Sequence, residues 1–243
     1  MAWSGYYGPV TGVVLFNALV YLSLRYTTST NAALINSVTP ILTMFLAAAV
    51  GLDRLTGRRL AGAFVSLVGV SWIVSRGSLE ALIEMSFNRG DLIMLVAALV
   101  WAIYTILLNR MRGELSPLAT LTIVALLALL PLSVIGGYEL MSNPIGPITP
   151  VVVAGLIYIS VLASVAAFMA WSVGIEGLGA ARGSIFLNLI PVFTAVIAVI
   201  TLGERVGLVQ LFGGLLVISG VTLASSRGWK HADTREGKAT KTG

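Results

Sequence analysis

Long apolar stretches separated by short polar segments run along nearly the whole chain. Crossing the hydrocarbon core of a bilayer takes about 20 apolar residues in an α-helix, at about 1.5 Å of rise per residue. Eight stretches meet this requirement, and they run approximately over 9–26, 30–50, 58–75, 91–110, 117–138, 150–174, 180–201 and 207–225. The pattern predicts an all-α membrane protein, a polytopic helical bundle of about eight transmembrane helices.

The segment between the third and fourth stretches has a different pattern. In SLEALIEMSF, Leu79, Leu82 and Ile83 share one helical face, and Glu80 and Glu84 share another. This pattern favours a short helix lying at the membrane surface, and a plain solvated loop is the alternative. We assign residues 78–90 to a periplasmic or interfacial linker.

The chain also resembles itself. Pro191 follows Pro40 at an offset of 151 residues (191 − 40), and the same offset without a gap pairs Asp53 with Glu204. Identical pairs in this frame are Thr43 and Thr194, Ala47 and Ala198, Arg54 and Arg205, Gly62 and Gly213, Gly69 and Gly220, and the SRG motifs at 75–77 and 226–228. The first three stretches therefore repeat as the last three, a signature of an internal structural repeat.

The two copies start five spans apart, an odd number, so they cross the membrane in opposite directions. Inverted repeats of this kind are a common construction of transporters. The fourth and fifth stretches have no counterpart at this offset, which predicts that the first half lacks two helices, about 60 residues with their loops, of a five-plus-five architecture. We expect an incomplete first repeat of three helices at 1–77 and a second repeat of five helices at 91–227.

Composition agrees with a membrane protein and narrows the function. Of the 243 residues, 57% are hydrophobic and only 10% are charged, with a mean hydropathy of +0.96. Soluble domains carry about 25% charged residues. The sequence contains no cysteine, which excludes disulfides and thiolate chemistry. The net charge of +5 comes from short loops and a tail beside apolar stretches, so we expect a lipid bilayer and no nucleic acid as partner.

The basic residues also indicate orientation. Eleven of the 15 Lys and Arg residues lie in the loops after the second, fourth and sixth stretches and in the tail, and four lie on the other side. Because positively charged loops stay in the cytoplasm, we expect both termini there, in a multi-pass protein of the inner (cytoplasmic) membrane. The polar, basic tail at 228–243 is expected to be disordered.

Four segments carry a resemblance to a transporter family. The second repeat of EamA-type transporters, in the drug/metabolite transporter superfamily, is similar to GDLIMLVAALVWAIYTILLNRM, LGAARGSIFLNLIPVFTAVIAVITLGER and LFGGLLVISGVTLAS. The later part of the first repeat resembles TTSTNAALINSVTPILTMFLAAAVGLDRLTGRRLAGAFVSLVGV. The resemblance implies ten helices in two inverted five-helix halves, with a substrate cavity between them and export or uptake of small metabolites.

Polar and aromatic side chains at helical spacing mark candidate lining residues of such a cavity. The candidate set is Asn17, Tyr21, Asn36, Trp101, Tyr104, Ser184 and Asn188. An unsatisfied polar group in hydrocarbon costs several kcal/mol, so these side chains should face protein or water. For any single asparagine, hydrogen bonding between helices is the alternative. Trp171 and Tyr158 fit an interfacial aromatic belt.

Prolines and small residues predict how the helices bend and pack. Proline removes a backbone hydrogen bond, so Pro40 and Pro191 predict two matched helix bends, with a packing kink as the alternative. Stripes of small residues allow helices to approach closely, within one protomer or between the protomers of a homodimer. These stripes are Gly62, Ser66 and Gly69, and Gly213, Gly214 and Gly220.

Other chemistry finds little support in the sequence. The only histidine, His231, lies in the polar tail, and no GxxxxGKS/T phosphate loop or cluster of metal ligands is present. We therefore expect no cofactor, no metal and no enzymatic activity. The predicted function is a membrane permease that moves a small metabolite, amino acid-like or drug-like and amphipathic, by export through alternating access. The alternative is a non-transporting membrane subunit or a truncated remnant of such a permease.

Overall fold

The computed structural model describes residues 7–83, 87–111, 116–142, 147–202 and 207–226. Every regular element within these ranges is a helix, and all eight predicted stretches are helical. Six helical segments are long and apolar enough to cross a membrane, namely Ser29–Ala49, Gly57–Val74, Arg89–Arg110, Pro150–Leu178, Ala180–Thr201 and Leu208–Ser225. The chain is thus an all-helical, multi-pass membrane protein, whereas the count of eight spans stays a prediction.

The elements divide the longer segments into shorter helices. In chain order they are α1 (Tyr7–Ser23), α2 (Ser29–Asn36), α3 (Thr39–Ala49), α4 (Gly57–Val74), α5 (Leu79–Ile83), α6 (Arg89–Arg110), α7 (Pro117–Ser142), α8 (Pro150–Ile157), the π-helix η2 (Tyr158–Ala166), α9 (Ala167–Leu178), α10 (Ala180–Gly183), the 3-10 helix η3 (Ser184–Leu189), α11 (Ile190–Leu202) and α12 (Leu208–Ser225). The short α5 lies in the predicted linker. Its position at a membrane surface stays a prediction.

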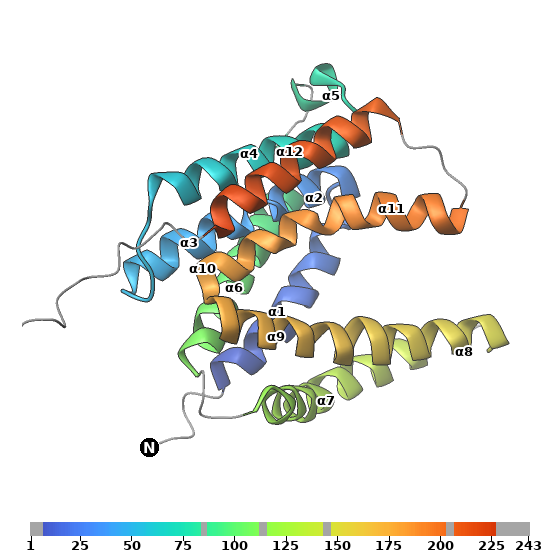
Figure 1. The fold of residues 1–243 in the computed structure, drawn as a ribbon. Helices are drawn as coiled ribbons and strands as arrows, with labels where there is room; N and C mark the ends of the chain where they lie inside the picture. Colours follow the sequence, from blue (N-terminus) through green and yellow to red (C-terminus); the bar gives the residue numbers. More distant parts are fainter. Residues whose placement is uncertain (1–6, 84–86, 112–115, 143–146, 203–206, 227–243) are drawn as a thin grey trace, which may run out of the picture.

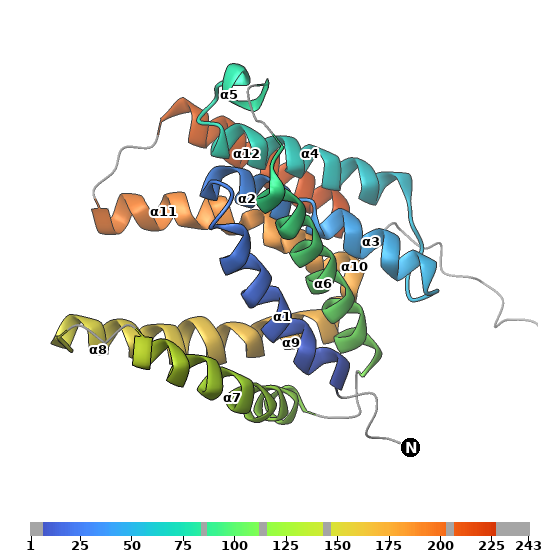
Figure 2. The same cartoon turned by 180° about the vertical axis from the view of Figure 1, so that it is seen from behind.

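The helices form two outer layers with a crossing pair between them. Figures 1 and 2 show α4 and α12 side by side on one side of the bundle, and α7 with α9 on the opposite side. Helices α1 and α6 pack together and run between these layers (Figure 1). Every described side chain from Val151 to Ala167 is exposed. This part of the chain is apolar around its circumference, as suits a helix surrounded by lipid.

Helices α4 and α12 pack backbone against backbone. A Cβ atom added to Gly69 would lie 2.7 Å from the backbone nitrogen of Val217, and one added to Gly62 would lie 2.6 Å from the carbonyl oxygen of Gly220. Such distances are shorter than real side chains tolerate, so these glycines are what permits the contact. Between lipid-embedded helices, close van der Waals packing at small residues is a main source of association.

We call this contact between α4 and α12 the seam. Its residue pairs have a two-fold pattern. The contacting pairs are Gly62 with Ala224, Gly69 with Val217, Gly213 with Ile73 and Gly220 with Ser66. Residue numbers rise along α4 while those of the partners fall along α12, so the two helices are antiparallel. The offset of 151 residues converts the first two pairs into the last two, which is the pattern that a two-fold axis between corresponding helices produces. Five of the six predicted stripe residues are thus used within one chain, and Gly214 is the exception, because a Cβ atom there would meet no atom of a neighbouring helix within 4 Å.

Both predicted bends coincide with the start of a helix that follows an interruption. Pro40 is the second residue of α3, which begins at Thr39 after α2 ends at Asn36. Pro191 is the second residue of α11, which follows the 3-10 turn of η3. Proline suits the first turn of a helix because the backbone N–H there has no partner within the helix. The two prolines therefore occupy corresponding places in the two copies of the segment.

A buried cluster of hydrogen bonds among Thr27, Asn88 and Asp91 fixes the start of α6 against the turn that follows α1. The hydroxyl of Thr27 donates to Oδ1 of Asp91 at 2.5 Å, and the backbone nitrogen of Asn88 donates to Oδ2 of Asp91 at 2.9 Å. The side chain of Asn88 in turn accepts from the backbone nitrogen of Asp91 at 3.1 Å, which completes a capping box. Because Asp91 is only 1% exposed, these donors and the helix N-terminus are what stabilise its carboxyl group there.

We predict that Gly220→Ala destabilises the protein. The added methyl group would overlap the backbone nitrogen of Ser66, and overpacking of a tight contact costs about 1–3 kcal/mol. The measurement is the apparent melting temperature of purified protein in detergent, followed by size-exclusion fluorescence. Gly214→Ala is the matched control on the same helix, because a methyl group there would meet no atom within 4 Å. Equal melting temperatures for the two variants would contradict the tight packing of Gly220 against Ser66.

Candidate functional site: an aromatic cluster around Trp101

Trp101 of α6 is the centre of a cluster of aromatic side chains. Its ring centroid lies 4.6 Å from that of Phe16 on α1 and 5.1 Å from that of Tyr104 on its own helix. On α9, the ring centroids of Phe168 and Trp171 lie 5.9 Å and 5.8 Å from it. These distances and tilted geometries are those of favourable aromatic pairs. Three helices therefore meet at one indole ring.

Helical spacing explains why the cluster residues of α6 lie on one side of that helix, as do those of α9. Side chains three, four or seven residues apart lie on one face of a helix, as Trp101, Tyr104 and Leu108 do on α6. Tyr104 and Leu108 are each 3% exposed and pack with the fully buried Ile175 of α9. Ser172, beside Trp171 on α9, is 4% exposed and lies near Tyr104. None of these side chains carries a formal charge.

Two donors within the cluster are unpaired. The indole Nε1 atoms of Trp101 and Trp171 are buried, and neither donates a hydrogen bond to any residue that the structure describes. Buried polar groups in proteins are nearly always hydrogen-bonded, and leaving one unpaired costs about 1–3 kcal/mol. The two N–H groups are therefore available to an acceptor on a water molecule or a bound compound.

A second buried polar position lies on η3. Asn188 is 2% exposed, and its Nδ2 atom donates to Oγ of Ser66 on α4 at 2.8 Å. The hydroxyl of Ser66 donates in turn to the carbonyl oxygen of Ala63 at 2.9 Å. Ser184 is fully buried, and its hydroxyl donates to the carbonyl oxygen of Ala181 at 3.4 Å. Asn188 thus ties the 3-10 segment to α4, and its Oδ1 atom has no partner in the described part of the chain.

The remaining predicted lining residues have other surroundings. Nδ2 of Asn17 donates to the carbonyl oxygen of Val13 on its own helix at 2.9 Å, and the Asn17 side chain is exposed. Tyr21 is 72% exposed. Oδ1 of Asn36 accepts from the hydroxyl of Thr39 at 3.2 Å, across the interruption between α2 and α3. Both asparagines bond within their own segments, and the lining role of all three residues stays a prediction.

Sequence reasoning selected only part of the aromatic cluster. It marks Trp101 and Tyr104 but not Phe16 or Ser172. The ring of Trp171 packs against Trp101, and its position in an interfacial belt stays a prediction. A signal was present on α9, where Phe168, Trp171 and Ile175 recur at helical spacing and lie on one face. Phe16 has no such signal, because α1 is apolar on every side and its inward face cannot be read from periodicity.

These features define a multi-pass helical membrane protein with an uncharged aromatic cluster between three of its helices. The model of the EamA-like transporter family matches residues 2–75 and 88–226. The chain belongs to this family, and the resemblance predicted from its motifs is confirmed. Membership of a transporter family points to a non-enzymatic permease, in keeping with the uncharged character of the cluster.

Individual relatives agree with this assignment. The chain is 33% identical over 221 residues to the uncharacterized transporter YyaM of Bacillus subtilis, which covers 89% of this chain and 70% of that protein. It is 28% identical over 223 residues to a probable terminal-alkyne amino-acid exporter of Streptantibioticus cattleyicolor, with 89% and 71% covered. It is 24% identical over 197 residues to a probable amino-acid metabolite efflux pump of Salmonella typhimurium, with 78% and 65% covered.

A solved structure supports the fold. One crystal structure matches this chain with a TM-score of 0.75 at 16% sequence identity, over 92% of this chain and 76% of the other. At this identity the match establishes a shared helical architecture only.

We predict that Asn188 and Ser66 are energetically coupled. A double-mutant cycle with Asn188→Ala and Ser66→Ala should give a coupling energy of about 0.6 kcal/mol, and at most about 1.7 kcal/mol, the range of hydrogen bonds between membrane helices. The measurement is the unfolding free energy in mixed detergent and SDS micelles. Ser184→Ala paired with Ser66→Ala is the control, because the Ser184 hydroxyl bonds within its own segment. Strict additivity of the Asn188 and Ser66 substitutions would refute the link between η3 and α4.

Proposed function

We propose that the chain is a permease that exports a small amphipathic metabolite, amino acid-like or drug-like, across the cytoplasmic membrane by alternating access. The observation that carries this proposal is the uncharged aromatic cluster around Trp101, with the unpaired indole N–H groups of Trp101 and Trp171. The names of two relatives, an exporter and an efflux pump for amino-acid compounds, support the substrate class and the direction.

The chemistry of the cluster suits an amino acid-like compound. Indole rings bind apolar groups, and their faces also attract ammonium groups through cation–π interactions. The two indole N–H groups supply hydrogen bonds to a carboxylate or carbonyl oxygen. One set of side chains thus offers a partner to each part of an amphipathic molecule, without a charged residue that would bind it too tightly to release.

The seam between α4 and α12 supports the inverted repeat on which alternating access depends. Its two-fold contacts relate the helices at the offset of 151 residues, as expected for repeats at 1–77 and 91–227 joined by the linker at 78–90. Phe16 belongs to the first repeat, and Trp101 and Trp171 belong to the second. The cluster therefore lies where the repeats meet, and rocking one repeat against the other would open it to either side.

The orientation follows from the basic residues. Loops rich in Lys and Arg remain in the cytoplasm, so both termini are proposed to lie there. The basic tail at 228–243 and the Glu204–Arg205 pair lie outside the described residues.

Transport by the purified chain tests the proposal. Trp101→Ala should lower the initial rate of uptake into proteoliposomes of radiolabelled neutral amino acids about two- to tenfold, the worth of one aromatic contact. Trp101→Phe should retain more activity, because it keeps a ring in the cluster. Trp72→Ala is the matched control, since Trp72 is also partly buried but packs against Phe212 outside the cluster.

Two outcomes would count against the proposal. Equal losses for Trp101→Ala and Trp72→Ala, accompanied by less folded protein, would assign Trp101 to packing. Absence of flux for the unsubstituted chain across a panel of amino acids and amphipathic drugs would favour a non-transporting membrane subunit.

A further inference from the structure

The bundle carries a basic pocket, and none of its lining residues belongs to the aromatic cluster. The pocket has a volume of about 560 Å³, and its lining includes Arg54, Arg58, Arg59, Arg182, Asp53 and Ser226. These residues come from the loop between α3 and α4, the first turn of α4, the helix α10 and the residue that follows α12. Elements of both proposed repeats therefore contribute to it.

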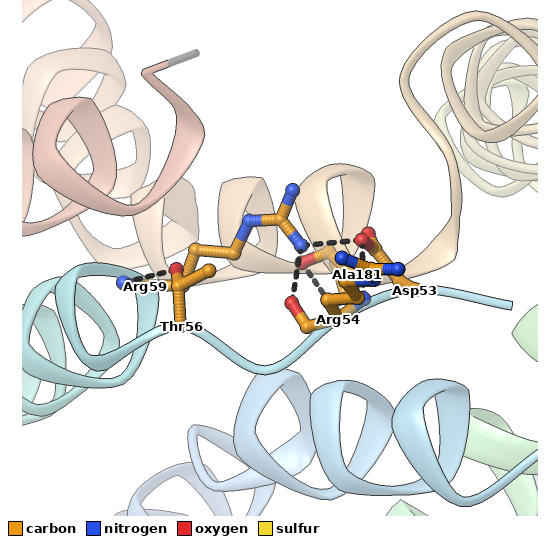
Figure 3. Close-up of polar contacts among 6 residues, drawn as sticks. Asp53, Arg54, Thr56, Arg59 and Ala181 are labelled. Carbon is orange, nitrogen blue, oxygen red and sulfur yellow. Dashed lines mark hydrogen bonds and ion pairs between the residues drawn. The ribbon is translucent and has the colours of Figure 1, made fainter. Parts of the chain in front are cut away.

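The only carboxylate among these lining residues is already paired. Nη1 of Arg59 lies 2.6 Å from Oδ1 of Asp53, and the backbone nitrogen of Arg54 donates to the same oxygen at 2.8 Å, as Figure 3 shows. Nη1 of Arg59 also donates to the carbonyl oxygen of Arg54 at 3.0 Å. Asp53 thus neutralises Arg59 and stabilises the loop between α3 and α4.

The other three arginines of the pocket, Arg54, Arg58 and Arg182, have no carboxylate partner among the residues that the structure describes. The Nε atom of Arg182 is buried and has no hydrogen-bond partner there. A buried, unpaired donor of a charged group is costly, so the pocket has the charge and the free donors to hold an anion.

An apolar groove also reaches the end of α12. It has a volume of about 380 Å³ and runs between η3 and α11 on one side and α12 on the other, with Phe186, Phe193, Val196, Ile218 and Ser225 in its lining. Ser225 lines the groove and the next residue, Ser226, lines the basic pocket, so both cavities reach the end of α12. The groove faces outward, because Phe193 is 60% and Val196 50% exposed.

We propose that this end of the bundle binds an anionic phospholipid, with its phosphate among Arg54, Arg58 and Arg182 and one acyl chain along the groove between α11 and α12. Arginine donates paired hydrogen bonds to phosphate oxygens, and basic pockets between membrane helices bind anionic headgroups. A free phosphate would use the basic pocket alone. The groove that also reaches the end of α12 is what identifies a lipid as the occupant, and the site does not depend on the transport activity proposed above.

Native mass spectrometry of the full chain in detergent tests the headgroup part of the site. One molecule of dioleoylphosphatidylglycerol should be retained in preference to dioleoylphosphatidylcholine. Arg58→Gln and Arg182→Gln should each lower the affinity for phosphatidylglycerol about fivefold, the contribution of one basic side chain near an anionic lipid. Arg25→Gln is the control, because Arg25 is exposed and lies outside the pocket. Equal retention of the two lipids, or equal effects of the three substitutions, would overturn the proposal.

A second pair of variants tests the groove. Val196→Trp should fill it and lower retention of phosphatidylglycerol, whereas Val68→Trp on α4, at a side chain with nearly the same exposure, should not. Stabilisation by inorganic phosphate alone, with no effect of Val196→Trp, would replace the lipid by a free anion. A change from dimer to monomer in Val196→Trp with unchanged lipid binding would assign the groove to a second copy of the chain. Either result would refute the lipid site.

Discussion

The architecture depends on the contact between α4 and α12, where glycines remove the side chains that would hold the two backbones apart. In lipid there is no hydrophobic gain from bringing apolar helices together, so close packing and a few interhelical hydrogen bonds must do so. The contact of Gly220 places the backbone of Ser66 against α12, and the Ser66 hydroxyl then holds Asn188 at 2.8 Å. Through Asn188, the seam positions the 3-10 segment from which α11 departs.

Interruptions in the helices are tolerated because nearby groups replace the lost hydrogen bonds. An unsatisfied backbone group in hydrocarbon costs several kcal/mol. Between α2 and α3, the hydroxyls of Ser37 and Thr39 donate to the carbonyl oxygens of Leu34 and Asn36, each at 2.6 Å. In front of α11, the chain instead tightens into η3, where 3-10 bonds replace α-helical ones. The two corresponding prolines are thus preceded by different local structures, side-chain hydrogen bonds before α3 and a 3-10 helix before α11.

The sequence predicts the parts of this fold that depend on local composition. Span positions follow from length and hydropathy, and the paired glycines follow from comparing the chain with itself. The inward faces are harder to predict, because lipid and protein interior are equally apolar and periodicity carries little information. Asn17 illustrates this difficulty, since its amide finds the carbonyl of Val13 on its own helix while the adjacent Phe16 packs against Trp101. The identical prolines likewise did not reveal that one copy would contain a 3-10 turn.

The aromatic cluster contains no charged side chain, and this constrains what the proposed substrate site could accept. The basic pocket contains arginines of the loop between α3 and α4, of the first turn of α4 and of α10, and the buried carboxyl group of Asp91 accepts from the Thr27 hydroxyl and the Asn88 backbone nitrogen at the start of α6. Phe16, Trp101 and Trp171 belong to neither group and contribute no charge. A net anion in that setting would meet a large desolvation cost with only two N–H donors to offset it. A molecule of zero net charge avoids this cost, because its ammonium can lie over an indole face while its carboxylate accepts the two hydrogen bonds.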